Sequence, residues 1–223
     1  YQDIIDYYIS PEMQKLMPAI AEAGGDITKV NGDSLFPVLN ALNARYFILP
    51  LQSGQTVPVK NPYVHGPAWF VDRITYADNA NGEIDAVGRI DLRREAVADK
   101  RFKDVLKTSA VQDSTASVKL TKYMADQLEY DVYSKTGGVI VFSEVYYPSW
   151  TATVDGQPAE LGRADYLLRA LNVAPGKHKV VLTFRPKSVT MTETTAYIAY
   201  AAIVIVIIIA AFIGYRKKKE QKA

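Results

Sequence analysis

Residues 139–156 read VIVFSEVYYPSWTATVDG, and this stretch decides the fold of the chain. It contains two runs rich in Val, Ile, Thr and aromatic residues with a proline between them, which is typical of neighbouring strands. It ends in Asp155-Gly156. An Asp-Gly pair predicts a tight hairpin, because both central residues of a type I′ turn need positive φ. The stretch therefore predicts strands joined by short turns.

Similar runs continue on both sides of this stretch. The predicted strands are SVKLTKY, LEYDVYS, VIVFSEVYY, TATVD, AEL, YLLRALNV and HKVVLTFR. Residues 135–138, KTGG, predict a second hairpin turn. In the last run Val180, Leu182 and Phe184 share one face, as a half-buried strand requires. We predict an antiparallel β-sandwich over residues 115–190.

Residues 1–106 have a different pattern and predict a small mixed α/β region. Ser10-Pro11 is typical of a helix start, and Pro18 is expected to kink or split that helix. Further predicted elements are a short helix at LFPVLNALN, strands at RYFIL, AWFVDRITY and residues 95–98, and a helix at residues 79–87. The polar residues 107–115 predict a linker or a loop. The expected fold class is therefore α+β.

Residues 197–215, YIAYAAIVIVIIIAAFIGY, contain no charged residue over 19 positions. At about 1.5 Å per residue, a helix of this length roughly spans a hydrocarbon core. Four cations follow at once, and positive charge marks the cytoplasmic side of a membrane. We predict a transmembrane helix over residues 195–216 and a basic cytoplasmic tail at residues 217–223, with residues 1–193 outside the cytoplasm.

Two alternatives for this apolar run stay open, namely a buried core helix and a sorting tail that is cleaved off. If the run is an anchor, about eight residues separate Pro186 from its start near Thr194. Fully extended, they reach roughly 26 Å at most. The sandwich is then expected to lie close to the membrane surface.

Composition excludes several classes of function. The formal net charge of +2 arises largely from the terminal basic cluster, so no nucleic-acid partner is expected. The chain has no cysteine, and its two histidines, His65 and His178, lie far apart, so no metal site is expected. It has no GxGxxG or P-loop motif, so no cofactor is expected. The chain begins at Tyr1 without a signal peptide, and we expect a fragment that follows an upstream segment.

Aromatic residues supply the first binding candidates. Around Pro148, at a predicted strand end, stand Tyr146, Tyr147 and Trp150. Such rings can stack on sugars or lie at lipid headgroups, and they can equally cover the core of the sandwich. Trp69 follows two chain breakers and either faces a groove or packs the first region on the sandwich.

Polar residues supply the second set of candidates. Asp155 can orient a ligand hydroxyl, although Asp-Gly is also what a tight hairpin needs for its backbone. The cationic candidates are Arg163, Arg169, His178 and Arg185. If they converge, they can bind a diphosphate through charge-assisted hydrogen bonds. Otherwise they can lie over aromatic rings or pair with carboxylates such as Glu144 and Glu160.

A family resemblance rests on motifs spread over nearly the whole chain. These motifs are Tyr1-Gln2-Asp3, LNARY at residues 42–46, Asn61-Pro62, AWFVD at residues 68–72, Ser143-Glu144, Tyr146-Tyr147-Pro148 with Trp150, Val154-Asp155-Gly156, Arg169, PGKH at residues 175–178 and Arg185-Pro186. On these residues the chain resembles the C-terminal extracytoplasmic region and last transmembrane helix of the bacterial membrane protein YfhO family.

The resemblance implies a complete protein with many transmembrane helices in the bacterial cytoplasmic membrane. It implies a GT-C-type glycosyltransferase that uses a lipid-linked sugar donor in cell-envelope glycosylation, with its catalytic acidic residues in a loop between early membrane helices. This chain contains no such helices, so we expect no catalytic residue in it. The expected partners are membrane lipid, the missing N-terminal helices, and a glycan or lipid-linked sugar.

We therefore expect an accessory module that helps to recognise the acceptor glycan or the lipid-linked donor. The alternative is a purely structural or interaction module anchored to the membrane. A third class, a tethered hydrolase, lacks support because the chain has no GxSxG motif.

Overall fold

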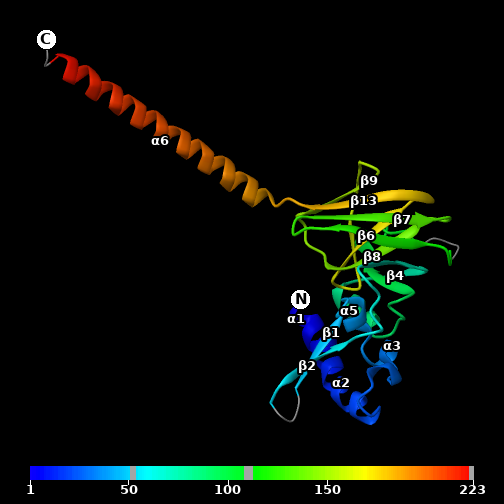
Figure 1. The fold of residues 1–223 in the computed structure, drawn as a ribbon. Coiled ribbons are helices and arrows are strands. Elements are labelled where there is room, and N and C mark those ends of the chain that lie inside the picture. The colour runs from blue at the N-terminus through cyan, green and yellow to red at the C-terminus, as the bar shows by residue number, and fades with distance from the viewer. Residues whose placement is uncertain (51–53, 108–112, 221–223) are drawn as a thin grey trace. The chain divides into compact units, whose positions relative to one another are not determined.

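A computed structural model describes residues 1–50, 54–107 and 113–220. The chain divides into two compact units, Tyr1–Thr183 and Phe184–Ala223 (Figure 1). The first unit contains every strand of the described residues except the end of the last one, and the second is dominated by one long helix.

A five-stranded sheet forms one layer of a sandwich in the first unit. Its strands, in spatial order, are β10 (Gln157–Ala159), β9 (Trp150–Val154), β13 (Gly176–Phe184), β7 (Gln127–Ser134) and β6 (Ser117–Tyr123). The pairings with defined register are antiparallel, and β13 pairs with β7 over eight positions from Gly176↔Ser134 to Thr183↔Gln127. The predicted alternation in β13 is confirmed, because Val180 and Leu182 are fully buried.

A four-stranded sheet forms the other layer. Its order is β11 (Gly162–Ala164), β12 (Leu168–Val173), β8 (Gly138–Val145) and β3 (Ala68–Val71). The edge strand β3 comes from the half of the chain before residue 107 and pairs with β8 from Ala68↔Phe142 to Val71↔Val139. The two halves that the sequence pattern separates therefore share one sheet.

The two sheets pack face to face around a common core. Tyr130 of β7 contacts Phe142 of β8 edge to face, with ring centroids 5.0 Å apart. Leu128, Val180 and Leu171 join the same core. Complete burial of a large apolar side chain contributes about 1.5–3 kcal/mol to the stability of the folded state. The predicted α+β fold with an antiparallel sandwich is confirmed.

The two predicted hairpins have different outcomes. Asp155 and Gly156 have φ of 52° and 80°, and they join β9 to β10 as a tight hairpin, as predicted. Residues 135–138 join β7 to β8, which lie in different sheets, so the second hairpin prediction is wrong. Glycines permit a sharp corner as readily as a hairpin, and the residues of the corner alone do not distinguish the two.

Two short parallel strands and a helix cover the outer face of the four-stranded sheet. They are β4 (Arg73–Ala77), α5 (Ala80–Val87) and β5 (Glu95–Asp99), followed by the 3₁₀ turn η3 (Lys100–Phe102). Asn79 begins α5 as predicted, with its side chain accepting from the Gly82 N–H. Ile84, Val97, Val141 and Ala170 belong to one buried cluster, which unites this layer with the sandwich.

The single strand predicted for residues 68–76 is wrong, because the segment forms β3 and β4 in two different sheets. The chain leaves the first sheet at Asp72, whose N–H donates to the Arg94 carbonyl at 2.6 Å. The Asp72 carboxylate also accepts from Arg94 Nε at 2.9 Å. An apolar run continues through this change of partner, so the sequence pattern does not reveal it.

The N-terminal helices differ from the prediction at their start. Helix α1 (Gln2–Ile4) continues through the π-helical η1 (Ile5–Ile9) into α2 (Ser10–Glu22). Ser10 is already helical, with φ −65° and ψ −46°, and so the helix does not start there as predicted. Pro18 lies inside α2 without splitting it.

A third cluster holds these helices to short elements that follow. The elements are η2 (Ile27–Lys29), α3 (Gly32–Leu35), α4 (Pro37–Ala41), β1 (Tyr46–Pro50) and β2 (Thr56–Lys60). Glu12 of α2 caps α4, because its carboxylate accepts from the Val38 and Leu39 N–H groups at 3.0 and 2.9 Å. Burial nevertheless raises the pKa of Glu12 to about 7.

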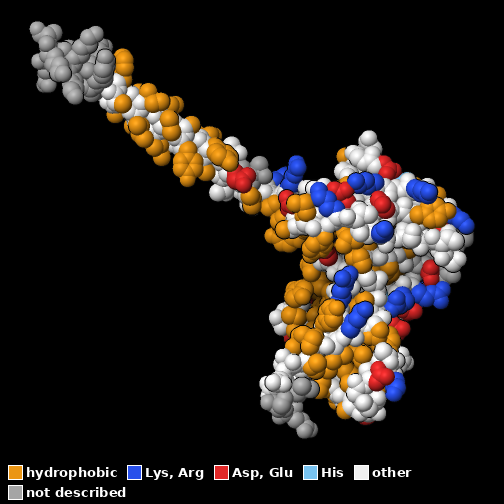
Figure 2. All heavy atoms as spheres, viewed as in Figure 1, with side chains coloured by type: hydrophobic (Ala, Val, Ile, Leu, Met, Phe, Trp, Pro, Cys, Tyr) orange, Lys and Arg blue, Asp and Glu red, His pale blue; other side chains and the backbone are white. Residues whose placement is uncertain are grey.

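The second unit is formed mainly by α6 (Lys187–Glu220). Residues 187–194, predicted as a linker, are helical, and they therefore advance about 12 Å rather than the extended 26 Å. Thr192 and Thr195 donate to carbonyls four residues earlier in the helix. Every side chain from Tyr197 to Ile213 is exposed, and Figure 2 shows hydrophobic atoms along the helix.

Candidate functional site

The aromatic corner, defined as Glu144, Tyr146, Tyr147, Trp150 and Arg169, lies where β8 turns into β9. The Trp150 N–H donates to the Tyr147 carbonyl at 3.0 Å and closes the turn. The Tyr146 ring packs edge to face on Phe102, with centroids 5.9 Å apart. Tyr147 is 56% exposed. The corner therefore combines one ring packed on Phe102 with a neighbour that faces solvent.

Arg169 of β12 lies beneath this corner and is only 3% exposed. Its guanidinium carbon is 4.1 Å from the centroid of the Trp150 ring, which is a cation–π contact. Its Nε donates to the Val145 carbonyl at 3.1 Å, and its Nη2 donates to the Glu144 carboxylate. Burial lowers the pKa of Arg169, and the Glu144 charge opposes this shift. The Trp150 ring is thus held in place by the buried Arg169, which forms an ion pair with the half-buried Glu144.

A bulge in β8 brings Glu144 to Arg169. Leu168 pairs with Val145, while the next residue, Arg169, pairs with Phe142. Two residues of β8, Ser143 and Glu144, are therefore extra at this point of the ladder. Bulges redirect side chains in this way and are frequent beside binding sites.

Asp155 and His178 form a second group on the other sheet. The Asp155 carboxylate accepts from the Lys179 N–H at 2.8 Å and lies 2.7 Å from His178 Nδ1. The hydrogen bond from His178 lowers the pKa of Asp155 after the larger effect of the Lys179 N–H, and the same bond raises the pKa of His178. Asp155 therefore has two roles: it forms the hairpin turn, and its carboxylate orients the His178 ring.

A groove of about 470 Å³ lies beside His178 on the five-stranded sheet. Its lining includes Lys119 of β6, Tyr133 and Asp131 of β7, and Lys177 of β13. Its volume is within the range of small-molecule sites. Because lysines and an aspartate line it together, the groove offers hydrogen-bond donors and acceptors and charges of both signs.

Arg163 of β11 contacts a group of residues that includes two buried acidic side chains, Glu83 and Asp165. It donates to Glu83 of α5 at 2.5 Å, and Glu83 also accepts from the Tyr166 N–H at 3.1 Å. Asp165 is buried, and this burial raises its pKa to about 8. Its carboxylate accepts from the Val97 N–H at 2.9 Å. Arg163 is therefore held by a carboxylate of another layer.

The turn that carries this group has unusual backbone angles. Asp165 and Tyr166 have φ of 51° and 66°, although neither is glycine. Left-handed conformations of such residues cost about 1–3 kcal/mol each. The Asp165 N–H donates to the Val97 carbonyl at 2.7 Å, and the Tyr166 hydroxyl donates to Asp3 at 2.5 Å. These contacts hold the turn against β5 and the N-terminal helix.

Trp69 is buried in the cluster between the sandwich and the α/β layer. Its indole N–H donates to the Leu92 carbonyl at 3.1 Å, and the His65 ring meets it edge to face at 4.8 Å. Burial lowers the pKa of His65 to about 4. His65 also lines a polar hollow of about 460 Å³ with Asp33 and Arg93.

The structure brings some of the predicted site residues together and separates others. Arg163 and Arg169 are cross-strand partners in β11 and β12, but Glu83 and Glu144 hold their guanidinium groups. Asp155 and His178 form the group on the other sheet. Arg185 is exposed and belongs to the second compact unit. Among the residues that the structure describes, no cluster of three or more His, Asp or Glu side chains could hold a metal ion.

Sequence reasoning named Glu144 as an arginine partner but missed Glu83, Asp165 and Tyr166. Glu83 contacts Arg163 and the Tyr166 N–H across about 80 positions of sequence, and Asp165, next to Tyr166, accepts from the Val97 N–H. Asp165 is of a residue type that tolerates a left-handed conformation, but Tyr166 is not, and no glycine marks the turn. No local pattern could have found this group.

The fold and the helix together define a class of protein. Within the described residues, one helix is long and apolar enough to cross a membrane, Lys187–Ile213, and it follows a β-sandwich unit. The class is a membrane protein with a folded domain of mixed α and β structure. The family model of the bacterial membrane protein YfhO matches residues 95–217. The chain belongs to this family.

The remaining comparisons identify no further relative. No curated protein matches the chain, and no solved structure matches it.

Proposed function

We propose that the first unit is an extracytoplasmic accessory module that recognises a glycan or a lipid-linked sugar through the aromatic corner. The observation that carries this proposal is the exposed Tyr147 beside Trp150, whose ring Arg169 and Glu144 hold in place. The membrane family and the C-terminal helix support a site of action at a membrane.

Aromatic faces suit sugars because a pyranose ring presents apolar C–H groups on one side and hydroxyls at its edge. A ring that is already ordered loses little conformational freedom on binding, so more of the contact energy appears as affinity. The buried Arg169, paired with Glu144, supplies this order for Trp150. Tyr147 adds an apolar face with a polar hydroxyl at its tip.

Recognition fits the corner better than catalysis does. Its one carboxylate, Glu144, is engaged by Arg169. Glycosyl transfer or hydrolysis needs an available acid or base near the scissile bond. On this proposal the chemistry of a lipid-linked sugar donor takes place at membrane helices of the same protein, as in GT-C-type glycosyltransferases, and the module contributes binding.

The groove beside His178 supplies a second point of contact for the same ligand class. Lys119, Lys177 and Asp131 line it together with the Tyr133 side chain. Sugar hydroxyls both donate and accept, so they match a lining of mixed charge. An acidic sugar or a phosphate would gain further from the lysines.

The experiment is binding of the full chain in detergent micelles to an array of bacterial cell-envelope oligosaccharides. We expect saturable binding that falls about tenfold or more in Tyr147→Ala, since stacking on one ring contributes on the order of 1.4 kcal/mol. Tyr123→Ala is the matched control, because Tyr123 is 71% exposed and lies on β6. Equal loss in both variants, or no binding by the folded protein, would count against recognition.

A structural or interaction module is the second candidate. Tyr146 packs on Phe102 and thereby joins the corner to the α/β layer. If the corner serves only packing, Tyr147→Ala will leave glycan binding unchanged or absent, and the module will be needed only for assembly of the membrane protein.

A further inference from the structure

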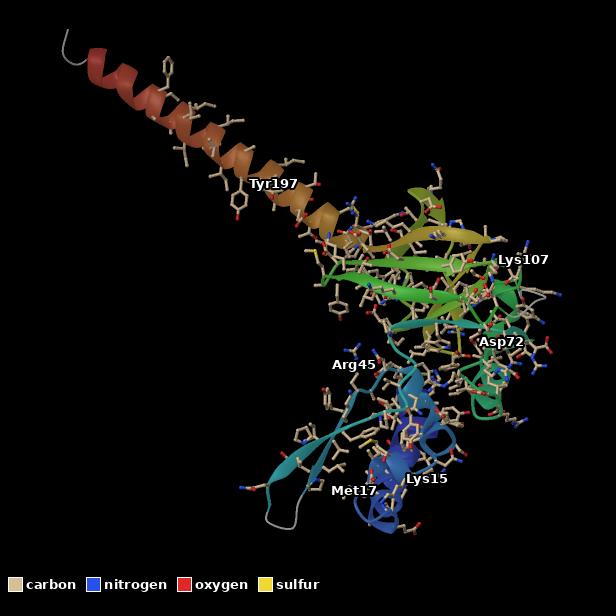
Figure 3. The ribbon with its side chains drawn as sticks, turned by 45° about the vertical axis from the view of Figure 1, so that its right-hand side comes forward. Lys15, Met17, Arg45, Asp72, Lys107 and Tyr197 are labelled. Carbon is tan, nitrogen blue, oxygen red and sulfur yellow. The ribbon has the colours of Figure 1, made fainter. Side chains whose placement is uncertain are left out.

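The β1–β2 hairpin has two apolar faces, although a two-stranded sheet on the surface needs only one. Its register pairs Tyr46 with Lys60, Ile48 with Pro58 and Pro50 with Thr56. These six residues share one face, because side chains alternate along a strand. Figures 1 and 3 both show the hairpin projecting from the rest of the first unit.

The inner face accounts for the stability of the hairpin. Phe47 and Leu49 are buried in the cluster with Leu16 and Phe36, and the Phe47 ring meets Phe36 edge to face at 5.5 Å. Isolated two-stranded hairpins are marginally stable in water, so this contact holds the pair of strands in place. The fold does not require the outer face to be apolar.

The outer face is exposed despite its composition. Tyr46 and Ile48 are 59% and 60% exposed, and Pro50 and Pro58 are exposed beside them. Folded proteins rarely leave a continuous apolar strip open unless it meets a partner. Isolated exposed apolar residues are normal, but here they are neighbours in register on one face.

The charge of the hairpin indicates the kind of partner. Residues 45–60 contain two cations, Arg45 and Lys60, and no Asp or Glu. Both cations lie where the hairpin joins the domain, at one end of the apolar strip, and Figure 3 labels Arg45 there. An apolar strip with a tyrosine and flanking cations matches an interface between acyl chains and anionic headgroups.

We propose that the outer face of the β1–β2 hairpin binds the surface of an anionic lipid bilayer. Tyr46, Ile48 and Pro58 enter the region of the headgroups, and Arg45 and Lys60 pair with lipid phosphates. This contact is additional to the membrane helix and independent of glycan recognition, since it uses residues outside the aromatic corner. It requires only that the protein lies at a membrane, as its family shows.

The test uses the full chain with a nitroxide at position 48, introduced as Ile48→Cys in a chain that has no native cysteine. The protein is reconstituted in vesicles of phosphatidylcholine and phosphatidylglycerol at about three to one, a mixture that provides the anionic surface. Electron paramagnetic resonance then measures collisions of the label with oxygen and with a water-soluble nickel chelate. We expect high collision with oxygen and low collision with nickel.

Two outcomes would overturn the proposal. Strong collision with nickel would show that the face stays in water, and weak collision with both reagents would show that it packs against protein. Ile48 is largely exposed, so the substitution should not disturb folding. Tyr46→Cys provides a second label on the same face if the first variant fails to fold.

Charge variants make the test specific to the hairpin. In the Ile48→Cys background, Arg45→Glu with Lys60→Glu is expected to raise nickel collision severalfold. Lys107→Glu with Lys135→Glu is the matched control, because both lysines are exposed and lie outside the hairpin and outside the groove beside His178. If the control pair raises nickel collision equally, the effect comes from the net charge of the protein, and this result would contradict a contact specific to the hairpin.

Discussion

Asp165 illustrates, at the scale of single residues, how burial sets the chemistry of this domain. Its carboxylate has one donor, the Val97 N–H, and its second oxygen has no partner among the described residues. The nearby Glu83 charge adds to the effect of burial and helps to raise the pKa of Asp165 to about 8. The side chain is therefore neutral at pH 7 in the folded state.

Replacing Asp165 with asparagine should stabilise the domain in a pH-dependent manner. The folded state keeps the proton from about pH 4 to about pH 8, whereas the unfolded state loses it near its ordinary pKa of 3.8. The folded state binds more protons in this window, so the free energy of unfolding of the native protein falls as pH rises. We expect Asp165→Asn to be about 2–4 kcal/mol more stable than the native protein at pH 8, with little difference near pH 4.

Denaturant unfolding of the full chain in micelles, followed by tryptophan fluorescence, measures this difference, because both tryptophans lie in the first unit. A difference between the two proteins that is constant from pH 4 to pH 8 would show that Asp165 titrates normally.

The pKa values of the two histidines should shift in opposite directions from the ordinary value. Burial lowers the pKa of His65 to about 4, and the bond to Asp155 raises the pKa of His178 above 6.5. His178 therefore stabilises the fold below pH 6.5, and this contribution is lost as pH rises through its folded pKa. His65 costs stability as pH falls from 6.5 towards 4, because the unfolded chain gains the proton first.

Nuclear magnetic resonance of histidine-labelled protein resolves both titrations. Asp155→Asn keeps a residue that tolerates the left-handed turn and should lower the pKa of His178 towards 6.5 while leaving His65 unchanged. An unchanged His178 titration in that variant would contradict the assigned contact.

At the scale of elements, local sequence patterns correctly predicted those structures that neighbouring residues determine. The Asp155-Gly156 hairpin, the helix after Asn79 and the alternation in β13 were all predictable from neighbouring residues. The separation of β3 from β4 depends on a hydrogen bond from Asp72 to the distant Arg94 carbonyl. The start of α6 at Lys187 was missed because its first two turns are polar, whereas the prediction followed the apolar run.

Helix α6 gives a prediction about topology. If the helix spans the membrane with its cations inside, Gln157→Cys on β10 should react with a membrane-impermeant maleimide on intact cells. Lys218→Cys should react only after the membrane is opened. The chain has no native cysteine, so each label reports one position. The reverse pattern of labelling would contradict the extracytoplasmic placement of the module.

At the scale of the whole molecule, the first unit depends on contacts between distant parts of the chain. Strand β3 completes the sheet of β8, and Val139 and Val141 share a buried cluster with Ile84 and Val97. A fragment beginning at residue 113 would expose the edge of β8 and this apolar face. The sandwich therefore should not fold by itself.

Expression of residues 113–223 should yield aggregated protein or a spectrum without dispersion, and co-expression of residues 1–107 should restore a folded complex. A well-dispersed spectrum from the fragment alone would show instead that the sandwich is independent.

The candidate site was predictable from the sequence only where local residues determine its geometry. Tyr147, Trp150 and Asp155 lie at strand ends and turns, where sequence patterns are informative. Arg163 and Arg169 were found as residue types, but their partners Glu83 and Glu144 depend on layer packing and on a bulge. The sequence pattern of a single strand shows neither the packing between layers nor the position of a bulge.

The most direct test of glycan recognition at the aromatic corner uses the two indole N–H signals of the native protein. Trp150 lies in the corner, and Trp69 is buried elsewhere and donates to the Leu92 carbonyl. The full chain in micelles is titrated with the oligosaccharide that binds best on the array. We predict a saturable shift of the Trp150 signal, a stationary Trp69 signal and loss of the shift in Tyr147→Ala. A Trp150 signal that stays fixed while the sugar binds, or that moves only together with Trp69, would contradict recognition at this corner.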